Sequence, residues 1–262
     1  MRAATALLSL FHAAGGAPVW RADELPADDA AGPVLPSGFA ELDRELPGHG
    51  WPQGQLTELL ADDAGIGELS LLAPALAQLA LARRCAVWVL AADADTRSPP
   101  ALPYAPALAA AGIDLARTIF VKPATPREGL WAIEQALRAQ HLGAVVGWLP
   151  AGSSAGDFKA LRRLHLLAQR HRALAFVLRP TRDAQAPSPA ALRLQLAGNG
   201  TQLAVTLLKR RGRPLLEPVT LALHPAHWAR ARVALNPATP NVQPAAKAAL
   251  LAARSLQAVL DH

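Results

Sequence analysis

The residues with the clearest potential for chemistry lie in segment 54–72, which runs from a predicted strand through a loop into a predicted helix. The strand, Leu56–Leu60, is apolar and leads into a loop that contains Gly65 and Gly67, and leucines at helical spacing follow. Loops of the pattern G-x-x-x-x-G-K-[ST] at such a place bind polyphosphates. Their backbone N–H groups surround the phosphates, the lysine neutralises them and the hydroxyl holds magnesium. The segment therefore has the layout of a phosphate-binding loop.

The charges of this loop are the reverse of those that a phosphate requires. Glu68 stands where the motif has lysine, Leu69 stands where it has the hydroxyl residue, and Asp62 and Asp63 add two carboxylates. Three carboxylates that face a polyphosphate repel it. We therefore predict a degenerate phosphate loop at residues 65–69 that needs no cofactor and catalyses no hydrolysis. Weak nucleotide binding without turnover stays open.

The charge balance of the whole chain favours an anionic partner. The 262 residues include 26 Lys and Arg against 20 Asp and Glu, and the pI is about 10.4. Nucleic acid is the first candidate for such a partner. Positive charge is concentrated in Arg162–Arg172 and Lys209–Arg213, whereas residues 1–70 are rich in acids. The Arg162–Arg172 segment is interpreted first as a solvent-exposed helix surface and second as a DNA contact.

Composition argues against several other kinds of site. A single cysteine, Cys85, excludes an internal disulfide and fits a reducing compartment. The eight histidines lack the spacing of metal ligands, so we predict no metal site. No apolar run reaches the roughly 18 to 20 residues that a membrane span needs. We therefore expect a soluble, cytoplasmic protein.

Strand-like and helix-like segments alternate along most of the chain. The predicted strands are Leu56–Leu60, Cys85–Ala91, Thr118–Lys122, Gly143–Leu149 and Ala173–Arg179. The predicted helices are Gly38–Leu46, Glu68–Arg83, one that ends near Gly112, one that begins at Thr125-Pro126, and Ala155–Arg172. This alternation predicts an α/β fold with a mostly parallel sheet flanked by helices.

The pattern changes after Leu192, and this change sets the predicted organisation of the chain. Leu192–Ala197, Leu203–Lys209 and Val219–Leu223 have the composition of antiparallel strands, and the first two form a hairpin. We predict three parts: an N-terminal helix and arm (1–33), a core with a C-terminal antiparallel hairpin extension (34–223), and a Pro/Ala-rich tail with a last helix (224–262).

Several stretches resemble known families. The element order and Val34-Leu-Pro-Ser-Gly-Phe-Ala-Glu-Leu-Asp43 resemble the RecA-like P-loop core, over about residues 34 to 223. A closer resemblance is to ImuA, a SulA-like family associated with translesion synthesis. It is carried by Val19-Trp-Arg-Ala-Asp-Glu-Leu25, Gly50-Trp-Pro-Gln-Gly-Gln-Leu-Thr-Glu-Leu-Leu60, Gly65-Ile-Gly-Glu-Leu69 and Leu102-Pro-Tyr-Ala-Pro-Ala-Leu108.

The resemblance to ImuA implies a function in the SOS response. The expected role is an accessory factor in error-prone translesion synthesis, mutagenesis and DNA repair. It would act as an adaptor for ImuB and an error-prone polymerase of the replicative type, with RecA as a further candidate partner. The SulA-like label implies an alternative, a cell-division inhibitor that binds FtsZ.

The RecA-like comparison also implies that catalytic groups are missing. An acid is expected at the end of the strand at Val145-Val146, but Gly147 and Trp148 stand there, and a polar sensor is missing near Val177. Asp93 or Asp95 could take the place of the catalytic acid that follows the second strand. With the changed loop, these losses predict that the protein is not an ATPase.

Two groups of residues are candidates for binding partners. The resemblance implies DNA contacts in the loops Pro150–Gly156 and Pro180–Pro189. The basic turn Lys209–Arg213 is interpreted equally as a site of phosphate contacts and as a solvent-exposed hairpin tip. The DNA-binding candidates are Lys209, Arg210, Arg211, Arg213, Arg179 and Arg182. The predicted helix Ala245–Leu260 has an apolar stripe that would contact either ImuB or the core. The stripe consists of Leu250, Leu251, Leu256 and Leu260.

Overall fold

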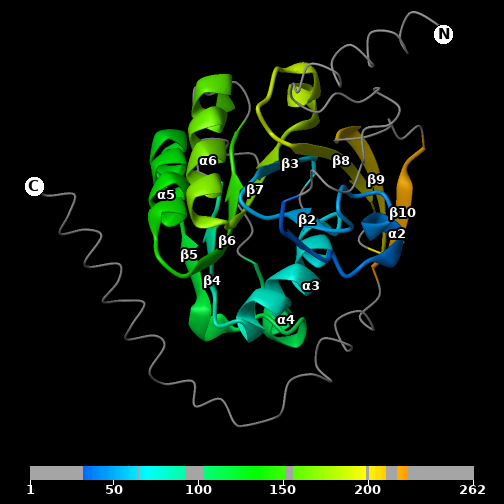
Figure 1. Cartoon of the computed structure of the whole chain (residues 1–262), viewed down its shortest axis with the longest axis horizontal. Coiled ribbons are helices and arrows are strands. Elements are labelled where there is room, and N and C mark those ends of the chain that lie inside the picture. The colour runs from blue at the N-terminus through cyan, green and yellow to red at the C-terminus, as the bar shows by residue number, and fades with distance from the viewer. Residues whose placement is uncertain are drawn as a thin grey trace, which may run out of the picture.

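A computed structural model describes residues 32–63, 65–91, 103–150, 156–198, 201–210 and 217–223 (Figure 1). The predicted core therefore falls almost wholly within the described residues. The predicted N-terminal helix and the tail from residue 224 lie outside them, so the proposed division into three parts stays a prediction.

Within the described residues, the centre of the fold is an eight-stranded mixed sheet. Its strand order is β10-β9-β8-β3-β7-β6-β4-β5. The strands are β3 (Leu56–Leu60), β4 (Cys85–Val89), β5 (Thr118–Val121), β6 (Leu142–Trp148), β7 (Leu174–Arg179), β8 (Leu192–Gly198), β9 (Gln202–Lys209) and β10 (Val219–Ala222). All pairs from β8 to β5 are parallel, whereas β9 and β10 add antiparallel. The prediction of a mostly parallel sheet is confirmed, and the antiparallel extension belongs to the same sheet.

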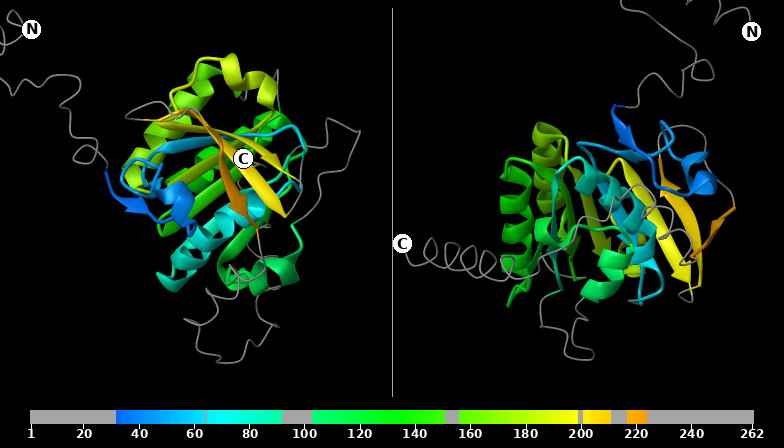
Figure 2. Two further views of the ribbon diagram at one scale, coloured as in Figure 1. Left: turned by 90° about the vertical axis from the view of Figure 1, so that its right-hand side faces the viewer. Right: turned by 90° about the horizontal axis from the view of Figure 1, so that it is seen from below.

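Helices cover both faces of this sheet (Figure 2). One face packs against α2 (Ala40–Asp43), α3 (Glu68–Leu81) and α4 (Ala105–Ala110), and the other against α5 (Pro126–Arg138) and α6 (Phe158–His171). Trp88 and Phe176 lie in the first core, and Ile133 and Leu161 lie in the second. The predicted α/β layering is thus confirmed.

Strand β3 lies in the interior of the sheet, with β7 on one side and β8 on the other. All five of its residues are buried. Its side chains alternate, so Leu59 enters the first core and Leu56 the second. A continuous apolar run is typical of a strand that is covered on both faces, but this run contains Glu58. The carboxylate of Glu58 must therefore find polar partners inside the protein.

Short elements and helix ends differ from the prediction. β1 (Val34–Leu35) and β2 (Trp51–Pro52) form a separate antiparallel pair. The sequence did not predict this pair, because each strand has only two residues. α6 begins three residues later than predicted, because Asp157 is its N-cap and accepts a hydrogen bond from the Ala160 N–H. The predicted start of α5 is confirmed: Pro126 is its first residue and the Thr125 side chain caps it.

Candidate functional site

The loop between β3 and α3 turns on two glycines with left-handed backbones. Gly65 has φ 79°, and Gly67, the N-cap of α3, has φ 116°. A Cβ on Gly67 would lie 2.0 Å from Cδ1 of Leu223. Glycine is thus favoured at position 67 for two reasons: the positive φ of its backbone, and the Leu223 side chain that leaves no room for a Cβ. The strand–loop–helix turn predicted from the sequence is present.

Glu68 fills the inside of this loop with its own carboxylate. Its Oε1 accepts a hydrogen bond from the Gly65 N–H at 2.9 Å, and its Oε2 accepts one from the Gly67 N–H at 3.1 Å. The residue is only 4% exposed. A negative charge at the N-terminus of a helix is stabilised by the helix dipole. Two N–H groups of the kind that bind phosphate oxygens in a working loop are therefore occupied by the chain's own carboxylate.

The two aspartates of the loop do not share the position of Glu68. Asp62 accepts hydrogen bonds from the hydroxyl and from the backbone N–H of Thr181, and Asp63 is exposed. The Thr181 hydroxyl, then its N–H, lower the pKa of Asp62 below its ordinary value of 3.8, and the charge of Arg182 lowers it further. The three carboxylates therefore differ in their surroundings: Glu68 is bound within the loop, Asp62 is held by Thr181, and Asp63 is exposed.

A second cluster of charge is buried in the middle of the sheet. Glu58 on β3 is fully buried and lies between two arginines of the neighbouring strands. Its Oε2 is 2.8 Å from Nε of Arg193, and its Oε1 is 3.3 Å from a terminal nitrogen of Arg179. The hydroxyl of Ser188 donates to the same Oε1 at 2.5 Å. Buried charges are tolerated only when they are paired in this way.

The two arginines extend this cluster to the loops at the carboxyl end of the sheet. Arg179 donates to the carbonyl of Gly156 and lies 3.0 Å from the carboxylate of Asp183. Arg193 donates to backbone carbonyls in and beside η3 (Thr181–Gln185), among them that of Asp183 at 2.9 Å. The cluster therefore holds the ends of the two loops that the RecA-like resemblance implied as DNA contacts. Within the described residues, these contacts tie the loops to the centre of the sheet.

Four of the six predicted DNA-binding residues lie within the described part of the chain. Arg179 is 5% exposed and paired with Glu58, which argues against a phosphate contact. Arg210 is paired with Glu45 at 2.9 Å, and the Lys209 amine donates to the carbonyl of Ser188. Arg182 is exposed. Arg211 and Arg213 lie outside the described residues, so a basic hairpin tip stays a prediction.

The other predicted residues are placed as follows. β6 carries no acid at its end, since Trp148 is followed by Leu149 and Pro150. A Cβ on Gly147 would lie 2.3 Å from Cδ1 of Ile133, so this strand packs closely on α5. Asp93 and Asp95 lie outside the described residues, as does the apolar stripe Leu250, Leu251, Leu256 and Leu260.

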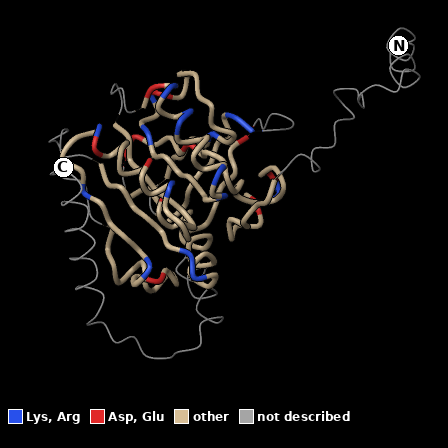
Figure 3. The backbone as a smooth tube through the Cα atoms, turned by 60° about the vertical axis from the view of Figure 1, so that its left-hand side comes forward, with Lys and Arg blue, Asp and Glu red and all other residues tan. Residues whose placement is uncertain are grey.

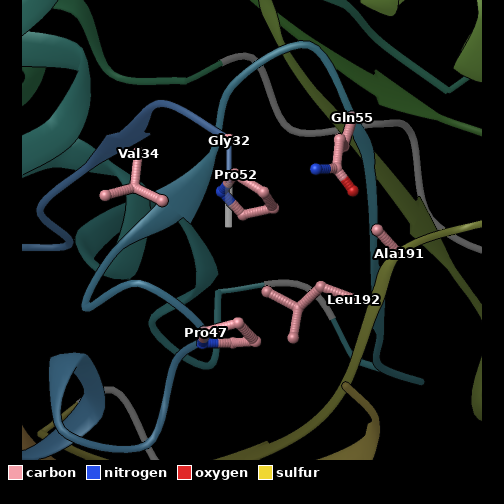
Figure 4. Close-up of a pocket in the computed structure, with 7 residues that line it drawn as sticks. All are labelled: Gly32, Val34, Pro47, Pro52, Gln55, Ala191 and Leu192. Carbon is pink, nitrogen blue, oxygen red and sulfur yellow. The ribbon is translucent and has the colours of Figure 1, made fainter. Parts of the chain in front are cut away.

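The described residues offer little else that could hold a ligand. A small hollow, with a volume of about 20 Å³, lies beside β2 and β8, and no charged side chain lines it (Figure 4). Its residues are Gly32, Val34, Pro47, Pro52, Gln55, Ala191 and Leu192. In the same part of the chain, no three His, Cys, Asp or Glu residues are grouped as metal ligands would be. None of the described helices is long and apolar enough to cross a membrane.

Sequence reasoning missed the buried cluster and the position of the Glu68 carboxylate. The sequence did contain a signal for the buried cluster, because a glutamate such as Glu58 inside an apolar strand predicts buried cationic partners. The signal for the Glu68 carboxylate was weaker: an acid that directly follows Gly67, the N-cap of a helix.

Fold and loop together define an α/β protein whose strand–loop–helix turn is closed by a carboxylate of the chain itself. No family model matches the sequence. Over 155 residues the chain is 30% identical to the cell division inhibitor SulA of Edwardsiella piscicida, and the match covers 59% of this chain and 76% of that protein. The chain therefore belongs to the SulA family.

Proposed function

We propose that the protein is a non-catalytic SulA-like accessory factor of the SOS response, which acts as an adaptor for ImuB and an error-prone polymerase in translesion DNA synthesis. The observation that carries the non-catalytic part is the carboxylate of Glu68, which accepts the Gly65 and Gly67 N–H groups. The adaptor part rests on the stretches that resemble ImuA. Membership of the SulA family supports a place in the SOS response.

The loop between β3 and α3 supports the non-catalytic part of this proposal, because it lacks groups that phosphoryl transfer requires. Such catalysis rests on positioned N–H donors, a cation and magnesium around the phosphates. In this loop the Gly65 and Gly67 donors are occupied, Glu68 replaces the cation, and Leu69 offers no hydroxyl. With no phosphate chemistry at the loop, the protein acts through its surfaces.

Two measurements test the two parts separately. ATP hydrolysis by the full chain, with and without single-stranded DNA, should stay at background. DNA-stimulated hydrolysis above background would overturn the non-catalytic part.

Co-purification with ImuB tests the adaptor part. The full chain should form a complex with ImuB, and the double substitution Leu250→Asp, Leu256→Asp should weaken it if the predicted tail stripe is the contact. Leu81→Asp is a control for one such added charge, because Leu81 is 53% exposed at the end of α3. The absence of any complex from the purified pair would rule out the adaptor.

A second candidate function is inhibition of cell division through FtsZ, which the match to a cell division inhibitor favours. This candidate predicts that overproduction makes undamaged cells grow into filaments, and that purified protein blocks FtsZ polymerisation. If both results are found and no ImuB complex forms, the second candidate replaces the first.

A further inference from the structure

The outer surface of α6 carries a row of exposed cations. Lys159, Arg162, Arg170 and Arg172 are exposed, and we call them the α6 basic face. Within the part of the chain that the structure describes, none of the four forms an ion pair, whereas the neighbouring Arg163 is paired with Glu134 at 3.0 Å. Figure 3 shows the basic residues in blue. The α6 basic face is thus open to an anionic partner.

The start of the described chain lies close to one end of this face. The carbonyl of Pro33 accepts a hydrogen bond from the Gln53 N–H at 2.9 Å. The next residue, Gly54, lies directly against α6: a Cβ on it would be 3.4 Å from Cα of Arg172. Pro33, Gln53 and Gly54 thus connect the point where the chain enters the fold to the C-terminal end of α6.

The residues before this point are strongly acidic. Residues 22–31 contain Asp23, Glu24, Asp28 and Asp29 and no basic residue. They lie three to nine residues before Gly32, so an extended chain places them within about 10 to 30 Å of it. The α6 basic face, from Arg172 back to Lys159, is about 20 Å long. Asp28 and Asp29 can therefore reach only the Arg172 end of the face, and Asp23 and Glu24 have the length to approach Lys159.

We propose that the acidic segment 23–29 of this chain docks on the α6 basic face. Charge complementarity and the short connection through Gly32 carry this assignment. An apolar match supports it over nucleic acid: Leu166 on α6 is 46% exposed, and Leu25 in the segment offers it an apolar partner that a phosphate backbone lacks. The opposing charges also direct the segment toward the face during docking.

Carbodiimide cross-linking of the full chain tests the contact. Arg170→Lys and Arg172→Lys keep the charges and supply amines that couple to nearby carboxylates. Mass spectrometry should find links from positions 170 and 172 to residues 23–29, which 1 M salt suppresses because the Debye length falls to about 3 Å. Lys122, directly after the edge strand β5, is the internal control and should give no such links.

A paramagnetic label measures how much of the segment is docked. The label is placed at Ala27→Cys in a Cys85→Ala background, and it should broaden the amide signals of α6. The substitutions Glu24→Gln, Asp28→Asn and Asp29→Asn should lower the ratio of docked to undocked chain roughly tenfold, the effect of losing about three exposed ion pairs. The matched control removes three exposed acids elsewhere, with Glu41→Gln, Asp63→Asn and Glu217→Gln, and should leave the broadening unchanged.

Three outcomes would overturn the proposal. Equal broadening in both triple variants would show that charge does not hold the segment. Links found only between differently isotope-labelled molecules would assign the face to a second copy of the chain. Absence of all links, with coupling of positions 170 and 172 to a 5′-phosphorylated oligonucleotide instead, would assign the face to nucleic acid.

Discussion

Glu58→Gln is the substitution that should destabilise the protein most for the smallest change in shape. It removes one charge from a fully buried position and keeps the size of the side chain. Arg179 and Arg193, whose side chains are only 4% and 8% exposed, then lose their shared counter-charge. The cost therefore comes from two buried cations rather than from lost packing.

The structure allows the size of this effect to be worked out. Removing one partner of a buried ion pair costs about 3–5 kcal/mol. Arg179 keeps Asp183 at 3.0 Å and Arg193 keeps three backbone carbonyls, so we expect the lower end. A loss of about 3 kcal/mol lowers the Tm of a protein of this size by about 6 to 12 °C.

Urea unfolding, followed by the fluorescence of the buried Trp51 and Trp88, measures this loss. Glu134→Gln is the control, because it breaks an ion pair of similar length at the surface, where the Arg163 side chain is 48% exposed. That change should cost at most about 1 kcal/mol. Equal losses in the two variants would refute the reasoning that Glu58 holds two buried cations together.

The remaining predictions concern the loop at β3. Glu68→Ala leaves the Gly65 and Gly67 N–H groups without their carboxylate and should lower the free energy of unfolding by about 2 kcal/mol. Glu68→Gln should lower it by less. Unchanged midpoints of denaturant unfolding in both variants would contradict this. Gly67→Ala should destabilise more than Gly65→Ala in the same assay, because both glycines have positive φ but only Gly67 has a close neighbour. The lowered pKa of Asp62 stabilises the fold above about pH 4. The stability difference between wild type and Asp62→Asn should therefore shrink as the pH falls below 3.8, and a difference that stays constant down to pH 2 would show that Thr181 does not hold the ionised form.

Most of the sheet was predictable because its signals are local. The apolar run of β3 and the cap at Thr125 are each read within a few residues, and both are confirmed. The two-residue strands β1 and β2 are too short to show any periodicity. Their pairing follows from tertiary packing around the buried Trp51, which no local pattern reveals.

The candidate site was predictable only in its backbone. Two glycines and a following helix indicated the turn, and the structure has it. The direction of each carboxylate was not predictable, because Asp62 is held by Thr181, which lies 119 residues away. Glu58 shows the same limit, since its arginine partners lie 121 and 135 residues further along the chain.

These separations have a consequence for synthesis on the ribosome. At about 5–20 residues per second, roughly 7 to 27 seconds pass between the emergence of Glu58 and that of Arg193, which is 135 residues later. Until β7 has emerged β3 lacks both of its neighbours, and until β8 has emerged it still lacks one, so its carboxylate stays hydrated. The apolar half of β3 is meanwhile exposed to wrong pairing. The central part of the sheet therefore forms late in translation. Chaperone binding to the nascent chain should fall sharply once β8 has emerged from the ribosome.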